Sequence, residues 1–100
     1  MNILLVCAAG MSTSLLVLRM KQAALNKGIK TDIEAIPIGE LKDYNKEITV
    51  ILLGPQVRHL QKQVTTQYPD IPSEVIDMRD YGLMNGENVL NAALRLAGKA

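Results

Sequence analysis

A single cysteine, Cys7, stands directly before a short segment of small and hydroxyl-bearing residues. The thiolate form of cysteine is a nucleophile, and a nearby helix N-terminus favours that form. Small side chains let an anion approach the backbone N–H groups, and Ser and Thr hydroxyls add further donors. The segment that follows Cys7 therefore predicts a phosphate-binding loop, made of Ala8, Ala9, Gly10, Met11, Ser12, Thr13 and Ser14.

Cys7 also has a purely structural interpretation, because free cysteine packs readily in protein interiors. One cysteine excludes an internal disulfide and a multi-cysteine zinc site, and the chain has one histidine, His59, which we interpret as an exposed helix residue. Asp77 and Asp80 flank a strand end, where Asp commonly caps or turns the chain. We predict no metal site and no cofactor. The residue types alone leave Cys7 open between a buried small hydrophobe and a reactive thiol.

The elements that must position Cys7 alternate between strand and helix. Two continuous apolar runs, at 2–6 and 48–53, indicate strands that are covered on both faces of a parallel sheet. The segment 30–36 alternates charged and apolar residues, as expected of a strand nearer the sheet edge, and 73–78 predicts a short fourth strand.

Three predicted helices and one helical turn, at 40–44, separate and follow these strands. The first helix spans 12–27, with Gly28 as its stop, the second follows Gly54-Pro55, and the third starts after Asn85 as N-cap. Their apolar faces are predicted to contain Leu15, Leu16, Met20, Ala23 and Ala24 in the first, Val57, Leu60, Val64 and Tyr68 in the second, and Val89, Leu90, Ala93, Leu94 and Leu96 in the third.

This pattern predicts a three-layer α/β sandwich with a four-stranded parallel sheet of order 2-1-3-4, in one domain over residues 1–100. Ligands of such sheets bind beyond the carboxyl ends of the strands, where the strand order reverses. Cys7 follows the first strand and Gly54-Pro55-Gln56 follows the third. We therefore expect this second loop to face Cys7, with Gln56 able to contact a bound phosphate or a partner protein.

Composition excludes several classes of function. The 100 residues have a formal net charge of +1 and only three aromatic side chains, which argues against a nucleic-acid binder. The longest apolar runs are too short to cross a bilayer, so no direct membrane insertion is expected. The first residues lack the positive flank of a signal peptide, and we expect a cytoplasmic, monomeric protein.

Residues 7–17, CAAGMSTSLLV, resemble the enzyme IIB component of the bacterial sugar phosphotransferase system (PTS), in its lactose/cellobiose/N,N'-diacetylchitobiose class. Residues 52–57, LLGPQV, resemble that family's second signature, and 75–77 followed by Tyr81-Gly82 resemble a third. The resemblance covers essentially the whole chain. It implies a flavodoxin-like fold with a cysteine phosphate loop like that of low-molecular-weight phosphatases.

The resemblance also implies a mechanism. Cys7 would accept a phosphoryl group from a phosphohistidine on enzyme IIA, and residues 8–14 would form the phosphate loop. The phosphocysteine would then pass the group to a disaccharide of the cellobiose, chitobiose or lactose type, bound in the membrane component enzyme IIC. Because enzyme IIC selects the sugar, this chain is expected to carry little information about its identity.

Two other functions are alternatives to that of a phosphocysteine carrier. A low-molecular-weight tyrosine phosphatase or arsenate reductase has a similar fold, but places an arginine six residues after its cysteine, where this chain has Thr13. Such phosphatases also use an Asp-Pro general acid, and this chain has only Pro69-Asp70. The other alternative is a non-catalytic flavodoxin-like regulatory module, although the chain lacks nucleotide-binding glycine motifs and has Leu53-Gly54 where a response regulator carries its phosphoacceptor Asp.

Overall fold

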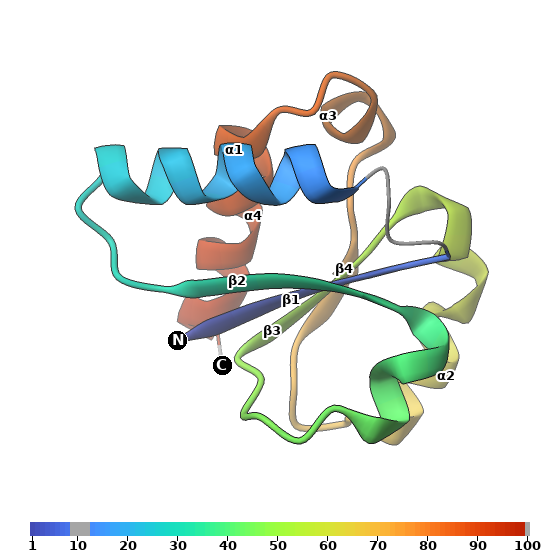
Figure 1. Cartoon of the computed structure of the whole chain (residues 1–100). Helices are drawn as coiled ribbons and strands as arrows, with labels where there is room; N and C mark the ends of the chain where they lie inside the picture. Colours follow the sequence, from blue (N-terminus) through green and yellow to red (C-terminus); the bar gives the residue numbers. More distant parts are fainter. Residues whose placement is uncertain (9–12, 100) are drawn as a thin grey trace.

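The structure, a computed structural model, describes residues 1–8 and 13–99 (Figure 1). Its four strands form one parallel sheet: β1 (Asn2–Cys7), β2 (Asp32–Pro37), β3 (Val50–Leu53) and β4 (Ser73–Val75). The strand order is β2-β1-β3-β4, which confirms the predicted order. The two strands with continuous apolar sequences, β1 and β3, are the central pair, and their side chains are almost entirely buried.

Helical layers cover both faces of the sheet, so the predicted three-layer sandwich is confirmed (Figure 1). On one face α1 (Thr13–Asn26) and α4 (Gly86–Lys99) pack against alternate strand residues such as Ile3 and Leu52. The other face carries η1 (Ile38–Asp43), η2 (Pro55–Leu60) and α2 (Gln61–Gln67), which contribute Leu41, Val57 and Val64 to a second core cluster. A short helix, α3 (Met78–Gly82), follows β4.

The strands predicted at 30–36 and 48–53 both begin two residues later, at Asp32 and Val50. Two other predicted elements differ from the structure for a local reason. The helix predicted after Gly54-Pro55 is a 3-10 helix joined to a short α-helix, because Val57 has non-helical φ and ψ of −116° and 20°. The strand predicted to end at Met78 ends at Val75. Asp77 instead caps α3, where its side chain accepts hydrogen bonds from Arg79 N and Asp80 N.

The apolar face of α1 is rotated relative to the prediction. Leu15 was expected in the core, but its side chain is 45% exposed, and Val17 is buried in its place. The helix stops as predicted, since Gly28 has a φ of 68° that suits a glycine at a helix C-terminus. At the start of α4, Asn85 acts as the predicted N-cap and accepts a hydrogen bond from Asn88 N at 3.0 Å.

Helices α1 and α4 meet at a close backbone contact beside α3. Arg19 Nη1 donates hydrogen bonds of 3.2 Å to the carbonyl oxygens of both Leu83 and Met84. Gly86, the first residue of α4, is buried there, and a Cβ atom at this position would overlap the main chain of Arg19 and Met20. The absence of a side chain at Gly86 therefore sets how closely α4 approaches the helix that begins beside Cys7.

We predict that Gly86→Ala destabilises the protein, because the added methyl group has no room against the α1 backbone. The expected loss in the free energy of unfolding is about 1–3 kcal/mol, measured by denaturant titration. Gly98→Ala in the same helix is the matched control, since a Cβ there meets no atom within 4 Å. Ala is the better helix former, so the control should match the unsubstituted protein or exceed it by up to about 1 kcal/mol. Equal stability of the two variants would contradict the role assigned to Gly86.

Candidate functional site

Cys7 lies at the point where the strand order reverses. It is the last residue of β1, the central strand, and its register partner on β2 is Pro37. On the other side, Gly54 N donates a hydrogen bond of 2.8 Å to Val6 O, directly after β3. A Cβ atom at Gly54 would lie 3.7 Å from Cys7 Cβ, so the second loop faces the cysteine as expected. Gln56 in this loop is exposed, and its contact with a phosphate or a partner stays a prediction.

The sulfur of Cys7 is enclosed, and among the described residues it contacts the oxygen atoms of Ile36 and Thr13. The residue is only 2% exposed. Its Sγ donates a hydrogen bond of 3.7 Å to the carbonyl oxygen of Ile36 on β2, and lies 3.5 Å from Thr13 Oγ1 at the start of α1. A thiol has one proton. When that proton points to Ile36 O, the hydrogen bond with Thr13 requires the threonine hydroxyl to donate.

Thr13 is the first residue of α1 and brings the N-terminus of that helix against the cysteine. Thr13 is completely buried, whereas Ser14 is exposed. The first turn of α1 contains no acidic residue, so no side chain of that turn offsets the positive end of the helix dipole. An anion bound beside Cys7 would therefore face the positive end of this helix dipole.

Only part of the predicted phosphate loop falls within the described residues. Ala8 is exposed, directly after the buried Cys7. Ala9, Gly10, Met11 and Ser12 lie outside the described residues, so their place in a phosphate-binding loop stays a prediction. What the described residues bring together is Cys7, Thr13, Ile36 and Gly54, from four different segments of the fold. Sequence analysis did not single out Ile36, whose contribution is a backbone carbonyl and carries no side-chain signal.

The enclosure of the sulfur bears on what the site can do. A phosphorus atom can reach Sγ only from an open direction, and the 2% exposure of Cys7 leaves little open surface. Attack by Sγ on a phosphorus atom would therefore require an arrangement in which the sulfur is more exposed. Burial is also what we expect if Cys7 only packs in the interior as a small apolar residue.

The other titratable residues considered in the sequence have structural or solvent-exposed positions. His59 is exposed on η2, as predicted. Asp77 caps α3, and Asp80 Oδ1 accepts a hydrogen bond of 3.0 Å from Asn88 Nδ2. Within residues 1–8 and 13–99, no group of three or more His, Cys, Asp or Glu side chains is arranged to hold a metal ion.

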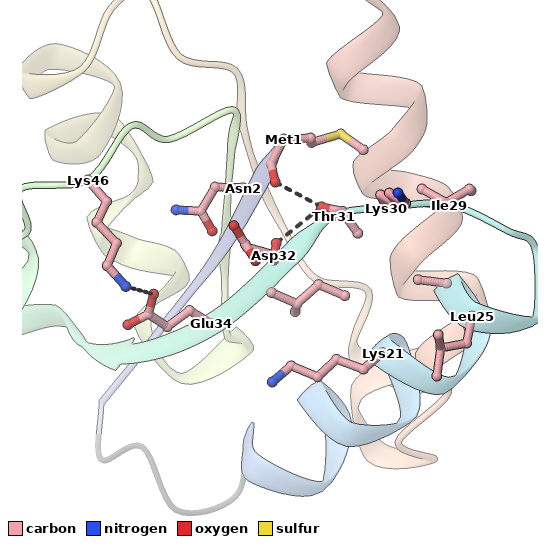
Figure 2. Close-up of a pocket in the computed structure, with 12 residues that line it drawn as sticks. Met1, Asn2, Lys21, Leu25, Ile29, Lys30, Thr31, Asp32, Glu34 and Lys46 are labelled. Carbon is pink, nitrogen blue, oxygen red and sulfur yellow. Dashed lines mark hydrogen bonds and ion pairs between the residues drawn. The ribbon is translucent and has the colours of Figure 1, made fainter.

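A groove of about 830 Å³ lies at the opposite end of the sheet, where β1 begins (Figure 2). It runs over the edge strand β2 between α1 and Lys46, which pairs with Glu34 at 3.5 Å. Five residue steps along β1 separate Asn2 in this groove from Cys7, or about 16 Å. The groove is therefore too far from Cys7 to hold a group that reacts with its sulfur.

A hydrogen-bonded chain beside this groove ties its polar side chains to the fold. Asn2 Nδ2 donates to the Tyr44 hydroxyl at 2.6 Å, and that hydroxyl donates to Glu34 Oε1 at 2.9 Å. Burial raises the pKa of Tyr44, and Glu34 raises it further. The neutral hydroxyl is thus the form that the folded state favours, and its contribution to stability is lost as the pH rises above the ordinary tyrosine range. The role of this chain is structural.

Comparison with known proteins links the whole fold to one family. Residues 2–92 match the family model described as "PTS system, Lactose/Cellobiose specific IIB subunit". The chain is 41% identical over 101 residues to the PTS system cellobiose-specific EIIB component of Lactococcus lactis subsp. lactis, covering 94% of both chains. It is 39% identical over 98 residues to the oligo-beta-mannoside-specific EIIB component of Bacillus subtilis, covering 95% of this chain and 94% of that protein.

Solved structures agree with this match. The solution structure of a cellobiose-specific phosphotransferase IIB component from Borrelia burgdorferi superposes with a TM-score of 0.81 at 46% identity, over 99% of this chain and 93% of that one. A lactose-specific IIB component from Streptococcus pneumoniae has the same fold, with a TM-score of 0.85 at 17% identity and 96% of both chains covered. Among the described residues of this chain, no helix has the length and apolar character needed to cross a bilayer.

Proposed function

Because the chain belongs to the lactose/cellobiose-specific IIB family of the PTS, we propose that Cys7 is the residue that carries its phosphoryl group. Members of this family are phosphotransferases of sugar transport that work with EIIA and EIIC components. One observation carries the proposal for Cys7. The chain's one cysteine ends β1 where the strand order reverses, in contact with the first residue of α1.

The proposed cycle has two transfers. In the first, Cys7 Sγ attacks the phosphorus of a phosphohistidine on enzyme IIA, the S–P bond forms as the N–P bond breaks, and the imidazole takes up the proton that the thiol loses. In the second, a sugar hydroxyl attacks the same phosphorus and its proton returns to the sulfur. Phosphoryl transfer needs chiefly positioning and charge stabilisation. The N-terminus of α1, with residues 8–14 as the phosphate loop, supplies these in the proposal.

The acceptor in this proposal is a disaccharide of the cellobiose, chitobiose or lactose type, bound in enzyme IIC. The similar proteins are named for different sugars: cellobiose and oligo-β-mannosides, as above, and galactose for an EIIB component of Lactococcus lactis subsp. cremoris that is 41% identical over 101 residues. This spread of names favours a choice of sugar by enzyme IIC. The proposal treats residues 1–100 as one IIB domain, acting as a monomer in the cytoplasm, where Gln56 contacts the phosphate or a partner.

We further propose that enzyme IIA docks on exposed apolar side chains beside Cys7. Leu15 and Leu18 on α1 are 45% and 63% exposed, although α1 begins in contact with the cysteine. Leu83, which is 64% exposed, lies next to α1, since its carbonyl oxygen accepts the hydrogen bond from Arg19. Leu15 and Leu18 are three positions apart on α1, so their exposed side chains are neighbours on the helix surface, and exposed apolar patches commonly mark protein interfaces. In the proposal, a partner bound to them lies beside the segment that carries Cys7.

Replacement of the nucleophile tests the carrier function. Cys7→Ser should leave the fold intact, because the change is nearly isosteric, and should abolish acceptance of a phosphoryl group from phosphorylated enzyme IIA. Intact-mass analysis with mapping of the modified residue measures the result. His59→Gln is the control, since it removes the chain's one histidine and should leave phosphorylation unchanged. If the Cys7→Ser variant still accepted a phosphoryl group, or if the His59→Gln variant no longer did, Cys7 would not be the residue that carries it.

A pair of charge substitutions on α1 tests the docking surface. Leu18→Asp places a charge among the apolar side chains and should slow phosphoryl transfer from enzyme IIA by about tenfold or more. Leu25→Asp is the matched control, because Leu25 is 77% exposed on the same helix but lies almost two turns further from Cys7. Both rates are measured from time courses of phosphoryl transfer at a sub-saturating concentration of phosphorylated enzyme IIA. Similar rates for the two variants would place the docking surface elsewhere.

A further inference from the structure

Thr13 combines two properties that point to a role at the sulfur. Among the described residues that are fully buried, it has the one polar side chain, with 0% exposure. Its hydroxyl oxygen lies 3.5 Å from Cys7 Sγ. Sequence analysis placed Thr13 in the phosphate loop, as a donor to the phosphoryl group. In the structure its hydroxyl contacts the nucleophile itself.

The two oxygens around the sulfur act differently on its two protonation states. Ile36 O is an acceptor only, so it stabilises the thiol, whose S–H points to it at 3.7 Å, and disfavours the thiolate. The Thr13 hydroxyl can donate to the sulfur in both states, and a hydrogen bond to a charged acceptor is stronger than one to a neutral acceptor. Thr13 is therefore the group in this pair that favours the attacking form of Cys7.

We propose that Thr13 is a positioning residue for phosphoryl transfer, and that its hydroxyl donates a hydrogen bond that orients Cys7 Sγ and stabilises the negative charge on the sulfur during attack. The proposal rests on the function proposed above. In the step concerned, the thiol proton leaves, Thr13 Oγ1–H donates to the sulfur anion, and the S–P bond forms while the N–P bond of the donor histidine breaks. The histidine nitrogen keeps the electron pair of the broken bond and binds a proton, so the thiol proton is accounted for.

A structural role and a positioning role for Thr13 make opposite predictions. Valine has nearly the shape of threonine without the hydroxyl, so Thr13→Val keeps the packing and removes the donor. Serine keeps the donor and loses a buried methyl group, which leaves a small void. If Thr13 only packs, Thr13→Ser is the more damaging change. If Thr13 positions the sulfur, Thr13→Val is the more damaging change for reaction rates, whatever its melting temperature.

The test measures three quantities on the full chain: melting temperature, the rate of Cys7 alkylation by iodoacetamide at neutral pH, and the rate of phosphoryl transfer from phosphorylated enzyme IIA. Thr13→Val should lose about ten- to a hundredfold in both rates, the range expected for one hydrogen bond to a charged group, whatever its melting temperature. Thr13→Ser should melt lower and keep both rates within a few fold.

The outcomes separate this proposal from the proposed function. Both rates unchanged in Thr13→Val would overturn the role of Thr13. A loss of alkylation rate in Thr13→Val, with no phosphoryl group on Cys7 of the unsubstituted protein, would support the Thr13 hydrogen bond and overturn the carrier function instead. Should Thr13→Val fail to fold, the pair Thr13→Ser and Thr13→Ala differs only in the hydroxyl, and the serine variant should react faster by the same factor.

Discussion

The position of Cys7 depends on the reversal of strand order between β1 and β3. From β1 the chain crosses over one face of the sheet to β2, and from β2 it returns past the other face to β3, on the opposite side of β1. The carboxyl ends of β1 and β3 are therefore neighbours, with no helix crossing directly between them. This arrangement brings three described residues to the cysteine: Ile36 from β2 and Thr13 from the crossover helix contact its sulfur, and Gly54 follows β3 beside its Cβ.

Within that frame, the hydroxyl of Thr13 distinguishes this site from that of a phosphatase with a similar cysteine loop. An arginine six residues after the cysteine would bind two oxygens of a phosphoryl group and leave a permanent positive charge beside it. Thr13 is neutral, completely buried and in contact with the sulfur. In the proposed mechanism, a neutral donor would stabilise the sulfur without placing a permanent positive charge against the phosphoryl oxygens. This difference accords with a protein that passes its phosphoryl group on.

Those parts of the fold that a single strong local pattern determines could be predicted from the sequence. The apolar runs of β1 and β3 predicted a buried central pair, and the small residues after Cys7 predicted a turn into a helix, which begins at Thr13. Features set by contacts between elements could not be predicted. Leu15 and Val17 are both apolar, and only the packing of α1 against the sheet and α4 decides that Val17 is buried. The contact of Cys7 Sγ with Ile36 O likewise joins residues 29 positions apart on two strands, and no local sequence pattern predicts it.

The enclosure of Cys7 has a consequence for the chemistry of its surroundings. Peroxides and small disulfides modify cysteines that are exposed as thiolates, and a residue that is 2% exposed is largely out of their reach. The same enclosure limits the access of other solutes, so a reagent reaches the sulfur only in an arrangement that exposes it more than this one does. A cognate protein that stabilises the open arrangement would thus gain selectivity over stray oxidants, and the lone thiol would survive many rounds of use.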